Sequence, residues 1–290
     1  MKKPYTPYLL LLPFFILMAL ILISIWNVIL QSLGYIPAFG LTTLTLDYYK
    51  EVFQQKEFIS ALTVSLKIAL ISAVFATVLG VLLCYALVKR NHTRGGLLYA
   101  VRLPILMPHA VVAVFVVNLL SQTGLFARIS YAFGFISDFN QFPQLLYSEN
   151  YLGAIIAYLW KEIPFVAYFV LALMSSISNS LGEAAENLGA SPWRSFFQIT
   201  LPLSMPAVLK AFLIIFIFAF GGYELPFLLG VTTPKALPVQ AYLAYTSPDL
   251  RERPYAMAMN AVILLLSLGI SLLYTFLMHR VTKLTGGDEQ

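Results

Sequence analysis

The run YLLLLPFFILMALILISIWNVIL, at residues 8–30, contains 23 residues and no charged side chain. A helix of this length crosses the hydrocarbon core of a bilayer, which requires about 20 apolar residues. The run is too long for the apolar region of a signal peptide, and no Ala-x-Ala cleavage site precedes the polar stretch at Gln31. We therefore expect residues 8–30 to stay in the protein as a membrane-spanning helix.

Five further runs have the length and the apolar character of spanning helices. They lie at about residues 60–88, 103–120, 151–173, 208–229 and 256–278. Helices satisfy their own backbone hydrogen bonds in lipid, and runs of 20 apolar residues do not fit the strands of a β-barrel. The sequence therefore predicts an all-α membrane protein with six transmembrane helices, organised as a single transmembrane domain over residues 1–290.

The composition supports the same class. Hydrophobic residues make up 60% of the chain and charged residues 11%, against about 25% charged in soluble proteins, which excludes an aqueous monomer. The single cysteine, Cys84, cannot form an intramolecular disulfide, a zinc cluster or an iron–sulfur cluster. The net charge of +5 follows from basic residues beside membrane spans, so we expect lipid and no nucleic acid as a partner.

Basic residues predict the orientation. Lys2 and Lys3 precede the first span, which favours a cytoplasmic N-terminus, and six spans then place the C-terminus on the same side. The tightest basic cluster, at residues 89–94, falls in an inside loop, as the positive-inside rule requires.

Three long loops fall on the outside in this orientation, at residues 31–59, 121–150 and 230–255. They are mixed in charge and rich in Phe, Tyr and Pro. One interpretation is that they lie as interfacial helices anchored among lipid headgroups. The other is that they form a docking surface for an extracytoplasmic partner. Composition does not choose between these two interpretations.

The inside loop at residues 178–206 carries a more specific pattern. Residues 183–188 favour a short helix with acidic residues in its first turn, and Gly189 is a natural stop. Ser191 and Pro192 then resemble a new N-cap with proline at the first helical position. We expect a helical hairpin whose second arm ends at Pro202 and Pro206, before the fifth span.

At these residues the chain resembles a known family. Glu183-Ala184-Ala185, then Gly189, then Ile199-x-Leu201-Pro202 resembles the E-A-A…G…I-x-L-P loop of binding-protein-dependent ABC importer permeases of the type I fold. The spacing of the marker residues matches, and so does the position between spans four and five. Leu46-Asp-Tyr-Tyr-Lys50 and the run at 221–230 look like permeases of the polyamine, phosphonate and ferric-iron group.

The resemblance implies a coupling helix that seats in a groove on a cytoplasmic ATPase subunit. Glu183 would be its polar anchor, Ala184 and Ala185 would allow close approach, and Gly189 would turn the chain back toward the membrane. The implied coupling set is Glu183, Ala184, Ala185, Glu186, Gly189, Ile199, Leu201 and Pro202.

The resemblance also implies partners and a location. These are ABC ATPase subunits, a second permease (a heterodimer rather than a homodimer) and an extracytoplasmic substrate-binding protein. The location is the cytoplasmic (inner) membrane of a prokaryote. ATP-driven closure of the ATPases would rock the spans from inward-open to outward-open.

No catalytic site is expected in the chain itself. It contains neither the phosphate loop Gly-x-x-x-x-Gly-Lys-Ser/Thr nor a His-Glu-x-x-His, Gly-x-Ser-x-Gly or paired-cysteine motif. His92, His109 and His279 are too far apart in sequence to suggest a metal site. We therefore expect no cofactor in this chain, with ATP and Mg²⁺ bound by the partner ATPase.

Ionisable residues inside spans are costly and often functional. The candidates for a translocation pathway are Lys67, Lys161, Glu162, Tyr223 and Glu224. In one interpretation Lys161 pairs with Glu162 or Glu224 as a clamp between spans. In another, Glu224 and Tyr223 line the outer part of the pathway. A carboxylate beside an aromatic face suits a cationic, polyamine-like solute better than a phosphonate. Ferric iron is a further possible solute. A third interpretation is a gate without solute contact.

The alternative function is a stand-alone secondary transporter. It would need inverted repeats and broken helices that coordinate an ion near the membrane midplane. The two halves of the chain show no clear repeat, and the inside hairpin would be left without a role.

Overall fold

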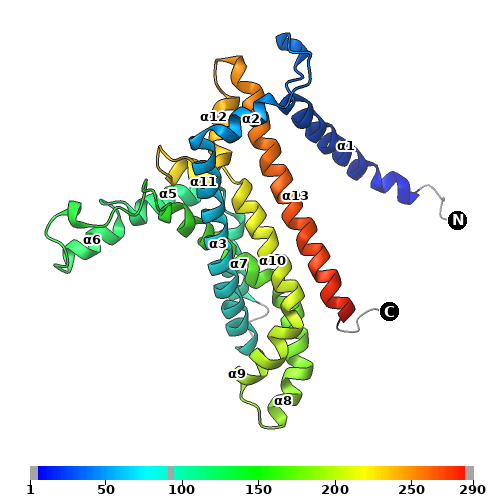
Figure 1. Ribbon diagram of the computed structural model, residues 1–290. Helices are drawn as coiled ribbons and strands as arrows, with labels where there is room; N and C mark the ends of the chain where they lie inside the picture. Colours follow the sequence, from blue (N-terminus) through cyan, green and yellow to red (C-terminus); the bar gives the residue numbers. More distant parts are fainter. Residues whose placement is uncertain (1–5, 91–94, 285–290) are drawn as a thin grey trace. The chain divides into compact units, whose positions relative to one another are not determined.

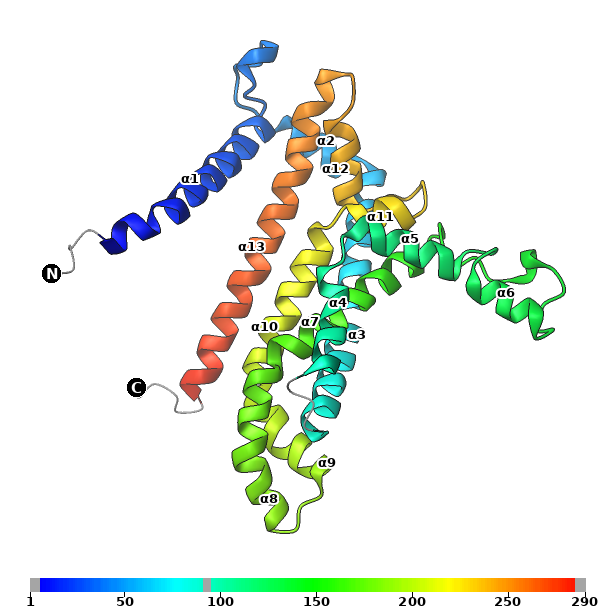
Figure 2. The ribbon, with the colours of Figure 1, turned by 180° about the vertical axis from the view of Figure 1, so that it is seen from behind.

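The computed structural model describes residues 6–90 and 95–284 (Figures 1 and 2). Within these residues the chain is helical, and the sole β feature is an isolated bridge between Ile36 and Leu41. The prediction of an all-α membrane protein is confirmed. Lys2, Lys3, His92 and Arg94, which entered the predictions above, lie outside the described residues, as does the side chain of His279.

The α-helices follow one another along the chain. They are α1 (Thr6–Ser32), α2 (Asp47–Gln54), α3 (Lys56–Lys89), α4 (Gly96–Leu106), α5 (His109–Leu120), α6 (Leu125–Ala132), α7 (Leu152–Ile177), α8 (Glu183–Asn187), α9 (Pro192–Ser195), α10 (Leu201–Gly221), α11 (Glu224–Leu229), α12 (Leu237–Tyr245) and α13 (Arg253–Leu284).

Six helical segments of the described chain are long and apolar enough to span a membrane, as predicted. They are Leu10–Ser32, Lys56–Lys89, His109–Ala132, Leu152–Asn187, Pro192–Gly221 and Leu250–Met278. Four of them agree with the sequence-based ranges apart from their ends. The third and the fifth differ in a way that matters for function.

The third predicted span, at residues 103–120, is not one helix. Residues 103–106 end α4, Met107 and Pro108 are extended, and α5 begins at His109. The cause is Pro108, whose ring disfavours a helical conformation at Met107. His109 therefore occupies the first turn of a new helix.

The fifth predicted span, at residues 208–229, is also divided. Its main helix, α10, starts earlier, at Leu201, and ends at Gly221; α11 then restarts at Glu224. Pro202 and Pro206 do not end the preceding helix as expected: Pro202 lies in the first turn of α10, which continues from the π-helical turn before it, and Pro206 lies inside α10. Glu224 thus begins a short separate helix and does not sit within a continuous span.

The described chain divides into two compact units. The first is Met1–Ile59 with Gln240–Leu266, and the second is Ser60–Val239 with Ser267–Gln290. In the first unit, the hydroxyl of Tyr49 in α2 donates to Ser32 Oγ at the end of α1 over 2.7 Å. Tyr255 of α13 donates to the Glu51 carboxylate and meets the ring of Tyr48 edge-on, with centroids 5.1 Å apart. These contacts fasten α2 to both long helices.

The start of α2 is itself anchored by charge. Hydrogen bonds from Thr45 and Lys50 hold the pKa of Asp47 below its usual value. An ionised Asp47 in the first turn also complements the helix dipole.

In the second unit, α7 is the most buried helix and packs along α10 and α3 (Figures 1 and 2). Small residues let these helices approach closely. A Cβ on Gly80 of α3 would lie 2.7 Å from Val166 Cβ and 2.8 Å from the Ile163 carbonyl oxygen of α7. Close approach at small residues is how membrane helices gain packing energy, because lipid supplies no hydrophobic force between them.

Gly80→Ala is expected to loosen this contact. The added methyl group meets backbone, which cannot rotate away, so we expect a cost of about 1–3 kcal/mol. The midpoint of thermal aggregation in detergent should fall. Gly96→Ala is the matched control, since a Cβ there meets nothing within 4 Å. Equal midpoints for the two variants would contradict the prediction.

Candidate functional site

The predicted helical hairpin is present at one end of the second unit (Figures 1 and 2). The chain leaves α7 through a π-helical turn, Ser178–Gly182, and enters α8; α9 returns through a second π-helical turn, Phe196–Thr200, into α10. Both arms are thus continuous with membrane-spanning helices. A force applied to the hairpin reaches α7 and α10 without an intervening flexible loop.

The turn of the hairpin depends on one glycine. Gly189 has φ of +95°, a left-handed conformation that side chains with a Cβ rarely adopt, and its N–H donates to the Glu186 carbonyl. Ser191 then caps α9 by accepting the Arg194 N–H over 3.3 Å, and Pro192 follows at the first helical position. The stop at Gly189 and the cap at Ser191 are as predicted.

Aromatic side chains seat α9 against the end of α3. The ring centroid of Tyr85 in α3 lies 5.3 Å from that of Trp193 and 4.6 Å from that of Phe196. The two arms are tied by Ser195 Oγ, which donates to the Gly182 carbonyl over 3.2 Å. The hairpin is therefore a preformed element within the described chain.

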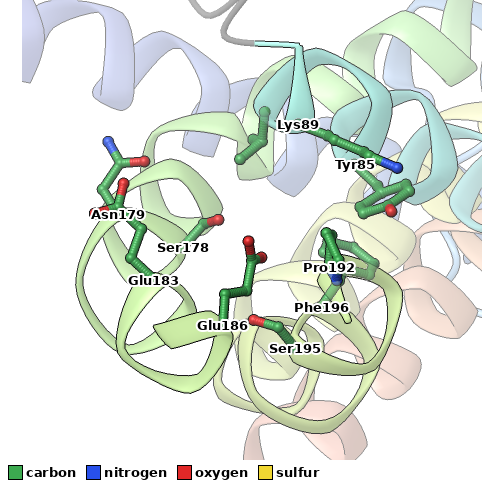
Figure 3. Close-up of a pocket in the computed structure, with 10 residues that line it drawn as sticks. Tyr85, Lys89, Ser178, Asn179, Glu183, Glu186, Pro192, Ser195 and Phe196 are labelled. Carbon is green, nitrogen blue, oxygen red and sulfur yellow. The ribbon is translucent and has the colours of Figure 1, made fainter. Parts of the chain in front are cut away.

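A cavity of about 520 Å³ lies between the hairpin and α3. Figure 3 shows the Glu186 side chain directed into it, with Lys89 and Tyr85 on the wall formed by α3. Glu183 lines the same cavity with Ser178 and Asn179. The two acidic residues of the predicted coupling set are thus together and accessible.

The tip of the hairpin exposes an apolar residue that the sequence reasoning did not single out. Leu188 is 90% exposed, and Ala184 beside it is also exposed. Its position directly before the helix-ending glycine is the signal that could have identified it. A fully exposed leucine next to small residues suits a surface that is covered by another protein.

The remaining predicted coupling residues lie away from the tip. Ile199 and Leu201 are half-buried in the return to α10, and Pro202 is exposed at its start. Leu201 lines an apolar groove between α3 and α10. These residues lie where the hairpin joins α10, away from its exposed tip.

A second constellation lies in the other half of the unit, where α5 and α11 begin (Figures 1 and 2). His109 Nδ1, in the first turn of α5, lies 2.7 Å from Glu224 Oε2, in the first turn of α11. Their side chains are 21% and 47% exposed. The pair joins the two helices that restart after a break.

The clamp between Lys161 and a glutamate, one of the three interpretations, is not present as an ion pair among the described residues. Lys161 Nζ donates to the Met107 carbonyl oxygen over 2.5 Å, and Glu224 takes His109 as its ion-pair partner. The break at Met107–Pro108 leaves that carbonyl without a helical partner, so a nearby ammonium group satisfies it. Glu162 is 3% exposed, and neither carboxyl oxygen has a hydrogen-bond partner in the described chain.

The break before α11 depends on close packing. A Cβ on Gly222 would lie 2.3 Å from the hydroxyl oxygen of Tyr158, a fully buried residue of α7. Tyr223 follows and is 38% exposed next to Glu224. Lys67 is exposed on α3 and has no ion pair in the described residues, so it does not join this constellation.

Neither constellation has the donors of a metal site. The described residues contain no group of three or more His, Cys, Asp or Glu side chains that could hold an ion.

Comparison with known proteins identifies the molecule. Residues 76–283 match the family described as the binding-protein-dependent transport system inner membrane component. The chain belongs to this family. It is therefore a multi-pass permease subunit of a binding-protein-dependent ABC importer, and a separate ATPase subunit hydrolyses the ATP. The alternative of a stand-alone secondary transporter is not supported.

The permease has relatives with diverse solutes. It is 28% identical over 232 residues to the molybdenum transport system permease protein ModB of Haemophilus influenzae, covering 79% of this chain and 96% of that protein. It is 26% identical over 219 residues to the putrescine transport system permease protein PotI of Escherichia coli, covering 75% and 71%. The sulfate permease protein CysT of Escherichia coli is 26% identical over 221 residues, covering 76% of each chain.

A solved structure has the same fold. A bacterial ABC transporter involved in the import of the acidic polysaccharide alginate superposes with a TM-score of 0.78 at 24% identity, covering 97% of both chains. The predicted type I permease fold is confirmed.

Proposed function

We propose that the permease imports a cationic, polyamine-like solute across the cytoplasmic membrane of a prokaryote. In this proposal all 290 residues act as one transmembrane domain, which pairs with a second, related permease as a heterodimer. Two ATPase subunits, which bind ATP and Mg²⁺, attach at the hairpin, and an extracytoplasmic binding protein delivers the solute. A known relative, the putrescine permease PotI, has a diamine in its name, which supports this solute class.

The coupling part of the proposal rests on the hairpin. Its small and acidic residues, Ala184, Ala185, Glu183 and Glu186, lie around an exposed Leu188 on a preformed turn. The arms continue into α7 and α10, so closure of the ATPases would move both helices as rigid bodies.

The solute part rests on one observation, the exposed carboxylate of Glu224 at the break between α10 and α11. Two exposed aromatic residues are near it: Tyr223 precedes it in the sequence, and the Phe218 ring lies against the ring of its partner His109. A carboxylate with aromatic faces attracts an ammonium group by charge and by cation–π contact.

Uptake of radiolabelled putrescine, molybdate and sulfate by cells that express the complete importer tests this proposal. We expect uptake of putrescine, and a loss of at least about tenfold with Glu224→Gln, which removes the charge and keeps the shape. Glu149→Gln, at an exposed carboxylate in an outside loop, is the control and should leave uptake unchanged. Uptake of either oxyanion in place of putrescine would overturn the cationic solute.

A further inference from the structure

The hydrogen-bonded pair of His109 and Glu224 connects residues that are 115 positions apart in the chain. Each lies in the first turn of a helix that restarts after a break, so the pair joins α5 to α11 at their starting points. In a continuous span, such a pair would merely link two rigid rods. Here it links two short helices, each of which starts at a break and also packs against α7.

The surroundings of His109 leave it one polar partner. Its ring lies 5.5 Å from the Phe218 ring of α10, and its Nε2 is buried without a hydrogen-bond partner in the described chain. If the side chains of His109 and Glu224 separate, the polar contact between the start of α11 and the start of α5 is therefore lost.

The breaks themselves have the features of hinges. At the first, Met107 and Pro108 are extended, and the Met107 carbonyl bonds to Lys161 of α7. At the second, Gly222 is extended and packs on Tyr158 of α7. Both hinges are thus fixed on the same helix, α7, which α5 and α11 also contact, while His109 and Glu224 provide the polar contact between α5 and α11.

We propose that His109 is a positioning residue of the pathway, which holds Glu224 and keeps α5 and α11 together in the closed arrangement. The pair parts when the pathway opens to the outside, and Glu224 then becomes available to the solute. This inference rests on the proposed function, since it assigns the moving part of the same pathway.

A reversible cross-link tests the inference. The complex of the permease with its partner permease and ATPase is reconstituted with the binding protein, and the permease carries His109→Cys and Glu224→Cys in a Cys84→Ala background. A short bis-methanethiosulfonate reagent joins the two cysteines, and a reductant releases them. The measurement is ATP hydrolysis stimulated by the binding protein, before and after cross-linking and after reduction.

We expect cross-linking to lower stimulated hydrolysis at least about tenfold, because an opening blocked at one step stops the cycle, and reduction should restore it. The same treatment of Asp249→Cys with Arg251→Cys, an exposed pair two residues apart in an outside loop, should have no effect. Complete cross-linking at 109 and 224 without loss of hydrolysis would overturn the inference.

Point variants separate positioning from a structural role. His109→Ala should raise hydrolysis without binding protein roughly three- to fivefold, as expected from the loss of a partly exposed ion pair, and His109→Lys should restore the low rate. A merely structural His109 would lower the yield of the complex and leave this rate unchanged. Failure of the proposed function gives another result, in which the permease that still carries His109 and Glu224 forms a complex without an ATPase or without stimulation by the binding protein.

Discussion

Leu188→Asp is expected to abolish association of the permease with its ATPase. The leucine is 90% exposed at the tip of the hairpin, so the change should leave the fold of the isolated chain intact. In the complex it would remove about 1.5–3 kcal/mol of apolar burial and place an unpaired charge in the interface. We therefore expect the affinity to fall at least about a hundredfold, measured by co-purification of the ATPase with the permease.

Two companion variants make this test specific. Asn187→Asp places the same charge one residue away, at another exposed position, and should retain most of the association. Glu183→Lys reverses the charge of the predicted anchor and should abolish association as Leu188→Asp does. If both Leu188→Asp and Glu183→Lys still carry the ATPase at wild-type amounts, the hairpin is not the coupling element.

Gly222→Val is expected to disrupt the break between α10 and α11. A Cβ at this position lies 2.3 Å from the Tyr158 hydroxyl oxygen, and Tyr158 is fully buried, so its ring has no space to move into. Overpacking of this kind costs about 1–3 kcal/mol, and relief by shifting α11 would separate Glu224 from His109. We expect a lower thermal midpoint together with loss of solute uptake.

Tyr158→Phe provides the internal control for this prediction. It removes the hydroxyl oxygen that the new side chain meets, so the double variant Gly222→Val/Tyr158→Phe should recover part of both the stability and the uptake. Should the double variant behave no better than Gly222→Val alone, the contact with Tyr158 is not the reason for the glycine.

The hairpin shows how far local pattern predicts a site in this protein. Its helix stop, its cap and its first-turn proline lie within ten residues of one another, at Gly189, Ser191 and Pro192, and all three are found where the sequence placed them. Such signals act through backbone conformation and short-range hydrogen bonds, which do not depend on the rest of the fold. Leu188 was missed because exposure of an apolar residue is a property of the folded chain.

The contacts of His109, Lys161 and Glu224 show where local sequence pattern does not predict which residues meet. The sequence placed Lys161, Glu162 and Glu224 in neighbouring spans, and opposite charge favoured a pair among them. Two helix breaks determine instead which partners these charged residues have. The first exposed the Met107 carbonyl to Lys161, and together they brought His109 and Glu224 to within 2.7 Å.

The sequence by itself determined that this protein is all-helical with six membrane-spanning segments, and its resemblance to ABC importer permeases pointed to the hairpin between spans four and five. Spans follow from length and hydropathy because lipid requires each segment to satisfy its own backbone, and that requirement is local. Pro108 is a local cause of the break in span three, whereas the tertiary structure alone decided where span five divides and which charged groups meet. Those outcomes depend on the packing of helices that are distant in sequence, where several partners of similar chemistry compete for one position.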